Sequence, residues 1–235
     1  MPASTALPHE CLGLIKLDTL FPRLPGDLGL ASSWGPHVQE AVIRGALPQL
    51  IVTQQQCFAD SAFAPAFGEA VCDLVQSGAS AITTSCGFLV LWQKELQALS
   101  PVPVITSSLC LLPDLLLREE QVAVLSIDAN SLTPMHWSGA GVSAQDLHRV
   151  VVRGLPPQSH FCQSILGNQA HLDAQQAQSE VVAAALQLKQ SAPHIQTMVL
   201  ECTNLPPYQK AIAEATGCKV LSLRDVPVLL KAANP

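Results

Sequence analysis

Short runs of apolar and β-branched residues alternate with longer amphipathic segments along most of the chain. This alternation is typical of βα units, in which a helix follows each strand and packs on the sheet. The runs are apolar at consecutive positions, which indicates strands that are covered on both faces and a mostly parallel sheet. The sequence therefore predicts an α/β fold. The expected strands are 11–17, 50–53, 79–84, 102–106, 121–127, 150–152, 195–200 and 219–221, and the expected helices are 62–76, 88–99, 108–118, 158–167, 173–190, 207–216 and 226–231.

The composition is that of a globular protein without a nucleic-acid or membrane partner. Of the 235 residues, 49% are hydrophobic, which is enough for one large core or two lobes. A formal net charge of −6 and the lack of a basic run argue against nucleic-acid binding. The apolar stretches are far shorter than the roughly 20 residues of a membrane span. The N-terminus does not resemble a secretory signal, so the expected location is cytoplasmic.

The cysteines and histidines do not have a metal-binding spacing. Eight cysteines are spread through apolar segments of a chain that is too long to need disulfides, so they are expected to be reduced. No CxxC pair occurs, and no two histidines stand four residues apart. The motifs GxGxxG, GxxxxGK(S/T) and GxSxG are also absent. The sequence therefore predicts neither a metal nor another cofactor.

One connection is too long for an ordinary turn. Residues 18–36 follow the first expected strand and contain three prolines and three glycines. Ligands of α/β proteins bind beyond the carboxyl ends of the strands, so this loop is expected to form one wall of a site. The alternative is a solvent-exposed connection.

A local pattern of apolar strand, polar turn with a cysteine, and apolar helix start occurs twice. It reads AITTSCGFL around Cys86 and MVLECTNLPPY around Cys202. The two cysteines are 116 residues apart, about half of the chain, which places one at a matching strand end in each of two lobes. A duplicated architecture follows from this spacing.

Thiols in such turns are suited to proton transfer. Backbone N–H groups and the positive end of a helix dipole stabilise a thiolate there, and they can also hold a carboxylate or an oxyanion. Across a cleft, one sulfur can remove a proton from a carbon while the other delivers one from the opposite side. This arrangement inverts a stereocentre next to a carbonyl without a cofactor. The other six cysteines are expected to be core residues.

With these motifs, the chain resembles the aspartate/glutamate racemase superfamily, which includes hydantoin racemases, maleate isomerases and arylmalonate decarboxylases. The resemblance implies two Rossmann-like lobes with mostly parallel sheets, related by a pseudo-twofold axis, and an active site in the cleft between them. Lobe one is expected at 1–106 and 211–235, and lobe two at 107–210. The segments that carry the resemblance are 14–29 (LIKLDTLFPRLPGDLG), 82–91, 102–109 (VPVITSSL) and 200–208 (LECTNLPPY).

The resemblance also implies functional residues, with Cys86 and Cys202 matching the acid/base pair. Amino-acid racemases usually have Asn-Thr after the first cysteine and Thr-His after the second. This chain has Gly87-Phe88 and Thr203-Asn204, which favours backbone amides for substrate binding on the first lobe and a more apolar pocket. The candidate substrate-binding residues are Asp18, Thr19, Thr84, Ser85, Gly87, Ser107, Thr203 and Asn204.

Other side chains near the motifs have two interpretations. Arg23 is either a clamp for a substrate carboxylate, since a guanidinium pairs with it in a bidentate fork, or a solvated loop residue. Glu201 can raise the pKa of the neighbouring thiol or orient it, but an ordinary strand-end carboxylate is favoured. His136 either faces the cleft or is a partly buried or surface histidine, and the second interpretation is favoured. Trp34 either covers the substrate or anchors its loop.

The sequence thus predicts an enzyme of the PLP-independent isomerase class, a racemase or epimerase of an amino acid or related small carboxylate. Cys86 and Cys202 are its two bases. The nearest alternative is a lyase of the arylmalonate decarboxylase type, in which one protonating cysteine suffices. A maleate-isomerase-like enzyme with a nucleophilic cysteine and a non-catalytic binding protein are further alternatives. The expected partner is a small-molecule carboxylate, with no nucleic acid and no membrane, and a homodimer is expected from the family.

Overall fold

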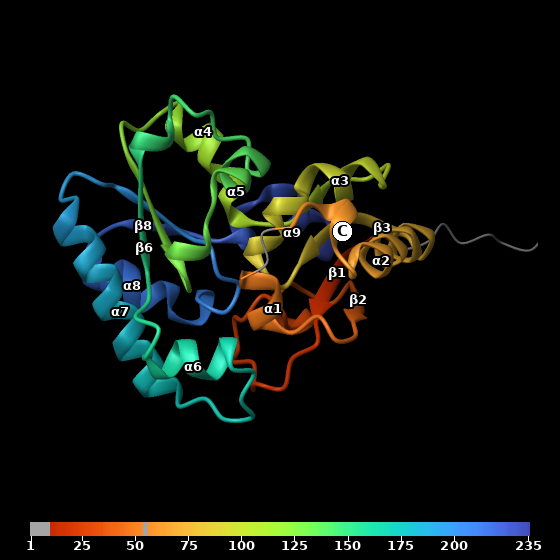
Figure 1. The fold of residues 1–235 in the computed structure, drawn as a ribbon, viewed down its shortest axis with the longest axis horizontal. Coiled ribbons are helices and arrows are strands. Elements are labelled where there is room, and N and C mark those ends of the chain that lie inside the picture. The colour runs from red at the N-terminus through yellow and green to blue at the C-terminus, as the bar shows by residue number, and fades with distance from the viewer. Residues whose placement is uncertain (1–9, 54–55) are drawn as a thin grey trace, which may run out of the picture.

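Two parallel sheets form the frame of the molecule. The structure is a computed structural model that describes residues 10–53 and 56–235. The strand orders are β2-β1-β3-β4 in the first sheet and β6-β5-β7-β8 in the second. The two sheets therefore have the same topology. Figure 1 shows the first sheet on the right and the second on the left. The strands are β1 (Cys11–Leu17), β2 (Val38–Ile43), β3 (Ala79–Thr84), β4 (Val104–Ile105), β5 (Val122–Ser126), β6 (Val150–Gly154), β7 (Thr197–Leu200) and β8 (Lys219–Leu221).

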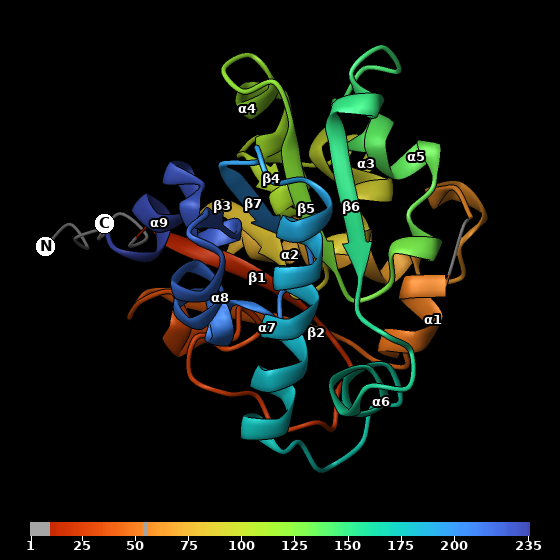
Figure 2. The ribbon, with the colours of Figure 1, turned by 90° about the vertical axis from the view of Figure 1, so that its left-hand side faces the viewer.

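Helices cover the sheets. On the first sheet α2 contacts β1, β2 and β3, while α9 contacts β1 and β3; on the second, α7 contacts β5 and β6 (Figure 2). None of the helices in the described part of the chain is long and apolar enough to cross a bilayer. The helices are α1 (Pro48–Thr53), α2 (Ala64–Gln76), α3 (Gln93–Ala98), α4 (Leu112–Leu116), α5 (Pro134–Gly139), α6 (His160–Leu166), α7 (Ala174–Ser191), α8 (Gln209–Thr216) and α9 (Pro227–Ala233).

Local chemistry explains where several elements begin and end. The Asp173 side chain accepts hydrogen bonds from the backbone N–H groups of Gln175 and Gln176, which caps α7 as the sequence predicts. Gly217 ends α8 in the left-handed conformation at φ +69°, which an L side chain rarely adopts. In β1 every side chain is buried except the half-buried Lys16, as expected for a strand covered on both faces.

Some sequence predictions of elements were wrong. Residues 50–53 were expected to be a strand because they are β-branched, but they belong to α1, which starts at Pro48. Neither β2 nor α5 was expected. β2 is an edge strand with exposed Gln39 and Glu40, so its polar residues hide the strand pattern.

The α/β architecture with two Rossmann-like lobes is confirmed, but one boundary changes. Lobe one was expected to include 211–235, whereas β8 pairs with β7 in the second sheet. α9 returns to the first sheet, and Leu223 and Val226 in the segment before it pack into the same buried cluster. The largest cluster of buried side chains is shared by both lobes and includes Cys86 and Cys202, so the two lobes meet through a continuous core.

Candidate active site

The two cysteines occupy equivalent positions in the two sheets. Cys86 comes two residues after β3, and Cys202 two residues after β7, each the third strand of its sheet. In each sheet the third strand along the chain, β3 or β7, lies beside the first, β1 or β5. Between these two strands the order of the sheet reverses, because the second strand lies on the other side of the first. Ligands of open α/β sheets bind at this place, beyond the carboxyl ends of the strands.

One pocket is lined by residues that follow the inner strands of both sheets. It encloses about 340 Å³ of space, part of it open to solvent. Thr19 follows β1, Cys86 follows β3, Ile127 follows β5 and Cys202 follows β7. The pocket thus brings together both thiols and side chains from both lobes. Its apolar lining includes Leu17, Phe21, Val52, Phe88, Ile165 and Leu166.

Hydrogen bonds hold the two cysteine turns against each other. The Thr203 hydroxyl donates to the Ser85 carbonyl oxygen at 2.6 Å, from one lobe to the other. The Ser85 hydroxyl accepts from the backbone N–H of Leu17 at 3.0 Å, which fixes the first turn to the end of β1. These buried bonds fix the relative position of Cys86 and Cys202.

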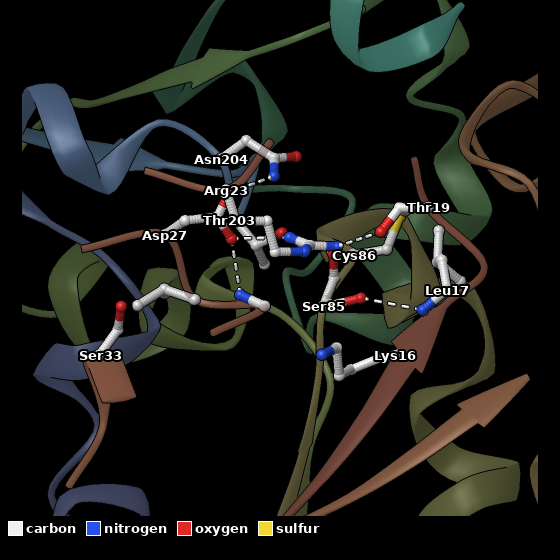
Figure 3. A network of polar contacts seen from close by, with 12 residues as sticks. Lys16, Leu17, Thr19, Arg23, Asp27, Ser33, Ser85, Cys86, Thr203 and Asn204 are labelled. Atoms are coloured by element: carbon white, nitrogen blue, oxygen red, sulfur yellow. Dashed lines mark hydrogen bonds and ion pairs between the residues drawn. The ribbon is translucent and has the colours of Figure 1, made fainter. Parts of the chain in front are cut away.

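The long loop after β1 supplies a buried ion pair to the same site (Figure 3). Arg23 donates through Nη1 to Asp27 Oδ1 at 2.7 Å and through Nη2 to the Thr19 hydroxyl at 3.2 Å. The Asp27 carboxylate also accepts from the side-chain amide of Asn204 at 2.7 Å and from the Gly29 N–H at 2.7 Å. The loop is therefore tied to the second cysteine motif, and Arg23 lines the pocket with its guanidinium held in place.

Both thiols are stabilised in their neutral form. Burial raises the pKa of the Cys86 thiol to about 12, and the Glu201 charge adds to the rise. The backbone N–H groups of Phe88 and Leu89 and the Arg23 charge act in the opposite direction. The pKa of Cys202 is raised well above its ordinary value, again by burial first and Glu201 second. The N–H groups expected to stabilise a thiolate are present, but desolvation outweighs them.

Glu201, which directly precedes Cys202, is buried in the wall of the pocket. Only 1% of it is exposed, and burial raises the pKa of its carboxyl to about 8. The Ser126 hydroxyl donates to Oε2 at 2.9 Å. The favoured expectation, an ordinary strand-end carboxylate, was wrong, because the residue after β7 points into the cleft and not to solvent. Its position directly before Cys202 was the available signal.

Three of the predicted substrate-binding residues do not line this pocket. Asp18 accepts from the Gly45 N–H at 3.0 Å and pairs with Arg44 at 3.5 Å on the outer side of the loop. Thr84 donates to the Thr106 carbonyl oxygen at 2.8 Å. Ser107 accepts from the Leu109 N–H and caps a short turn. These side chains are used for local structure. The predicted residues that do line the pocket are Thr19, Ser85, Cys86, Gly87, Cys202, Thr203 and Asn204.

His136 and Trp34 do not line the pocket, but each contacts a residue of a segment that forms it. His136 is fully buried with its ring edge against Phe88, 5.4 Å between centroids, and burial lowers its pKa to about 4. Trp34 donates through Nε1 to the Leu28 carbonyl oxygen at 2.9 Å and so anchors the long loop. Within residues 10–53 and 56–235, no group of His, Cys, Asp or Glu side chains could hold a metal ion.

Comparison with known proteins identifies the family. No family model matches the chain. A dimethylsulfoniopropionate lyase of Durusdinium sp. clade D is 31% identical over 228 aligned positions, covering 90% of this chain and 71% of that protein. The chain belongs to the dimethylsulfoniopropionate lyase family. Dimethylsulfoniopropionate lyases 3 and 6 of Emiliania huxleyi are each 28% identical over 90% of this chain, which spans 56% of their length.

Solved structures with a similar fold come from racemases and decarboxylases. An aspartate racemase homologue from Pyrococcus horikoshii has a TM-score of 0.58 at 14% identity, covering 96% of this chain and 100% of that one. A mutant of arylmalonate decarboxylase has a TM-score of 0.60 at 13% identity, covering 95% and 93%. The predicted fold, that of the aspartate/glutamate racemase superfamily, is confirmed. Because the sequence relatives are named lyases, the comparisons favour the lyase alternative over a racemase.

Proposed function

We propose that this protein is a lyase that eliminates dimethyl sulfide from dimethylsulfoniopropionate. The observation that carries the proposal is a single apolar pocket lined by two thiols and one held guanidinium. The names of the sequence relatives support the choice of substrate. This substrate has a carboxylate at one end and a sulfonium group, a good leaving group, on the second carbon from it.

The proposed reaction needs one base. A thiolate of Cys86 or Cys202 takes a proton from the carbon next to the carboxylate. The electron pair of that C–H bond forms the carbon–carbon double bond, and the bond from the neighbouring carbon to sulfur breaks. Its electron pair leaves with the sulfur, which becomes neutral dimethyl sulfide. The other product is acrylate, and the proton stays on the thiol until solvent accepts it.

The charges of the substrate match the pocket. The Arg23 guanidinium keeps N–H groups beyond those used for Asp27 and Thr19, and these can pair with the substrate carboxylate. The sulfonium charge entering the pocket lowers the pKa of a nearby thiol, because an opposite charge favours the thiolate. We therefore expect a base that ionises only when the substrate is bound.

Incubating the wild-type protein with dimethylsulfoniopropionate under reducing conditions tests the proposal. Headspace gas chromatography should detect dimethyl sulfide, and proton NMR should show the vinyl signals of an equal amount of acrylate. The matched control is the double variant Cys86→Ser/Cys202→Ser, which should form neither product above the rate without protein. If the wild type also forms neither, the proposed reaction is wrong.

A racemase is the second candidate, because both thiols line the same pocket and a one-base elimination uses only one of them. Two-base racemisation predicts exchange of the α-proton of a chiral carboxylate with solvent and formation of the opposite enantiomer. Proton NMR in deuterium oxide with single enantiomers of amino acids and hydantoins distinguishes it. Exchange with inversion supports a racemase, and release of dimethyl sulfide without inversion supports the lyase.

A further inference from the structure

Only one of the two carboxyl oxygens of Glu201 has a hydrogen-bond partner among the described residues. Oε2 accepts from the Ser126 hydroxyl, whereas Oε1 is buried without a hydrogen-bond partner among the described residues. Leaving a buried carboxyl oxygen without a partner destabilises the fold, so an unused one in a pocket wall suggests a ligand. The residue is 1% exposed and lines the pocket together with both thiols.

The place of Oε1 is defined by the first cysteine turn. A Cβ atom added at Gly87 would clash with Oε1 and with the backbone carbonyl of Glu201. The carboxyl therefore packs directly on the residue after Cys86, while its own backbone leads into Cys202. Its charge acts on both thiols, and all three side chains line the same pocket.

Among the described residues, no unpaired positive charge favours ionisation of the Glu201 carboxyl. Arg23 is balanced by Asp27 at 2.7 Å. The Asp128 carboxylate opposes the ionisation of Glu201, whereas the Ser126 hydroxyl and the Ile127 backbone N–H favour it without supplying a full charge. Burial also opposes ionisation, so with a pKa of about 8 Glu201 is mostly protonated at pH 7. A cation in the pocket reverses this balance.

We propose that Glu201 forms the subsite for the cationic group of the substrate, a sulfonium or a quaternary ammonium on an apolar carbon. This inference rests on the proposed function and names how the substrate is selected. A sulfonium group has no N–H or O–H to donate, so it needs a negative charge and apolar contacts for its methyl groups. Glu201 offers the first, and Phe88 and Ile127 offer the second in the same pocket.

Two consequences follow for binding and release. Binding of the cation ionises Glu201, so the protein gives up about one proton per site at neutral pH. After elimination the leaving group is neutral, so its attraction to Glu201 is lost. The protein should therefore prefer a cationic ligand over a neutral one of the same shape.

Calorimetric titration with two unreactive probes tests this subsite. Dimethylsulfonioacetate carries the cationic sulfonium group next to its carboxylate but has no second carbon for elimination, and 3-methylbutanoate has the same shape with an uncharged CH group in place of the sulfonium sulfur. At pH 7 the wild type should bind the cationic probe at least about tenfold more tightly. Repeating the titration in buffers of different ionisation enthalpy should show release of about one proton with the cationic probe only.

Glu201→Gln should abolish both the preference and the proton release. Glu119→Gln is the matched control: Glu119 lies at the other end of β7, accepts from Thr197 at 2.6 Å, and also has a buried carboxyl oxygen without a described partner. It should behave like the wild type. If Glu201→Gln does not fold, the double variant Cys86→Ser/Cys202→Ser decides: it has no pocket thiol that could ionise, so it should still release about one proton with the cationic probe only.

The subsite is wrong if wild-type binding shows no preference or no proton release, if neither probe binds, or if Glu201→Gln keeps both properties. Failure of the proposed function is read separately, from the absence of dimethyl sulfide with the wild type. A protein that releases dimethyl sulfide but binds both probes equally would keep the function and lose the subsite.

Discussion

The two thiols share a pocket but have different surroundings. Cys86 faces backbone N–H groups and the positive charge of Arg23. Cys202 donates to Asn204 Oδ1 at 3.5 Å and is influenced by the negative charge of Asp27. Because these neighbours favour different protonation states, we expect unequal roles for the two cysteines.

Serine substitutions measure this inequality. A hydroxyl is a far weaker acid than a thiol, so the variant that loses the base, either Cys86→Ser or Cys202→Ser, should release dimethyl sulfide at least about 100-fold more slowly. The other variant should lose about tenfold or less. Cys218→Ser, at a buried thiol outside the pocket, is the control and should keep its rate. Equal, large losses in both variants would instead favour two-base chemistry.

The stability of the protein should depend on pH through Glu201 and His136, with opposite signs. Between about pH 4.5 and 8 the folded protein keeps a proton on Glu201 that the unfolded chain loses, so the free energy of unfolding falls with pH, by at most about 1.4 kcal/mol per unit. Burial lowers the pKa of His136 from 6.5 to about 4. Between these two pH values its contribution to the free energy of unfolding therefore rises with pH. Above pH 6.5 only Glu201 of these two acts. Urea unfolding at pH 6.5 and 8 should show a decrease that Glu201→Gln reduces, and an unchanged decrease would contradict the shift.

The sequence predicted the two thiols of the site but did not favour a role for the neighbouring Glu201 carboxyl, and the reason is physical. Cys86 and Cys202 stand in turns whose strand, turn and helix residues repeat across half a chain. Beyond the end of a strand the side chains no longer alternate between its two faces, so the sequence does not show which of them face the cleft: Glu201 and Cys202 both line the pocket, whereas Asp18 does not. Glu201 and Asp18 were therefore assigned to the wrong sides.

Among the elements, the loop of residues 18–36 does the most to shape the site. Its Leu28 N–H donates to the Thr203 carbonyl oxygen at 3.0 Å, and Asp27 holds Arg23 and Asn204. The sequence predicted a site wall from the length of this loop and its place after the first strand. The contact with the second lobe was not predictable, since it depends on how the two sheets face each other.

Removing the Asp27 carboxylate should release this loop. Asp27→Ala leaves the Arg23 guanidinium buried without its counter-charge, which costs about 3–5 kcal/mol of stability. We also expect weaker substrate binding, seen as a higher KM, because the guanidinium loses its fixed orientation. Urea unfolding and steady-state kinetics measure the two effects. Glu214→Ala, in an exposed pair with Lys210, should change neither, and a similar result for both variants would contradict the role of Asp27.

Elements with a strong local signal were predicted, and those set by tertiary context were not. The helix after Asp173 was expected at 173–190 and is observed as α7, Ala174–Ser191, because its cap is encoded locally. The β-branched run in α1 and the polar edge strand β2 follow their packing and not their propensity. The predicted parallel sheets are correct because they depend on several buried strands at once.

At the scale of the molecule, the site depends on the alignment of two sheets with the same strand order. The Thr203 hydroxyl bridges the lobes at the Ser85 carbonyl oxygen, and the Ser108 hydroxyl, which follows β4 of the first sheet, donates to the carbonyl oxygen of Leu200 at the end of β7. Such buried bonds keep catalytic groups at a fixed separation, and a shift of about 1 Å can cost about 100-fold in rate. The relative position of the lobes is thus part of the site.

Thr203→Val should separate the effect on alignment from the effect on stability. The substitution keeps the shape of the side chain but removes the hydrogen bond to Ser85, so stability should fall by about 1–3 kcal/mol. The turnover number should fall by about tenfold or more. Thr197→Val, at the start of the same strand and far from the pocket, should lose stability but keep its turnover number. If both variants turn over alike, the bridge does not align the thiols.

The return of α9 to the first sheet sets an order of events during synthesis. The strands of that sheet are complete at residue 105, but the apolar face with Leu12, Leu14 and Ala81 is covered by Leu229 and its neighbours. On the ribosome this face therefore stays open until after the entire second lobe has emerged. The lobe that is made first is the last to be finished, and its uncovered strands are the surface that a chaperone would have to shield in the meantime.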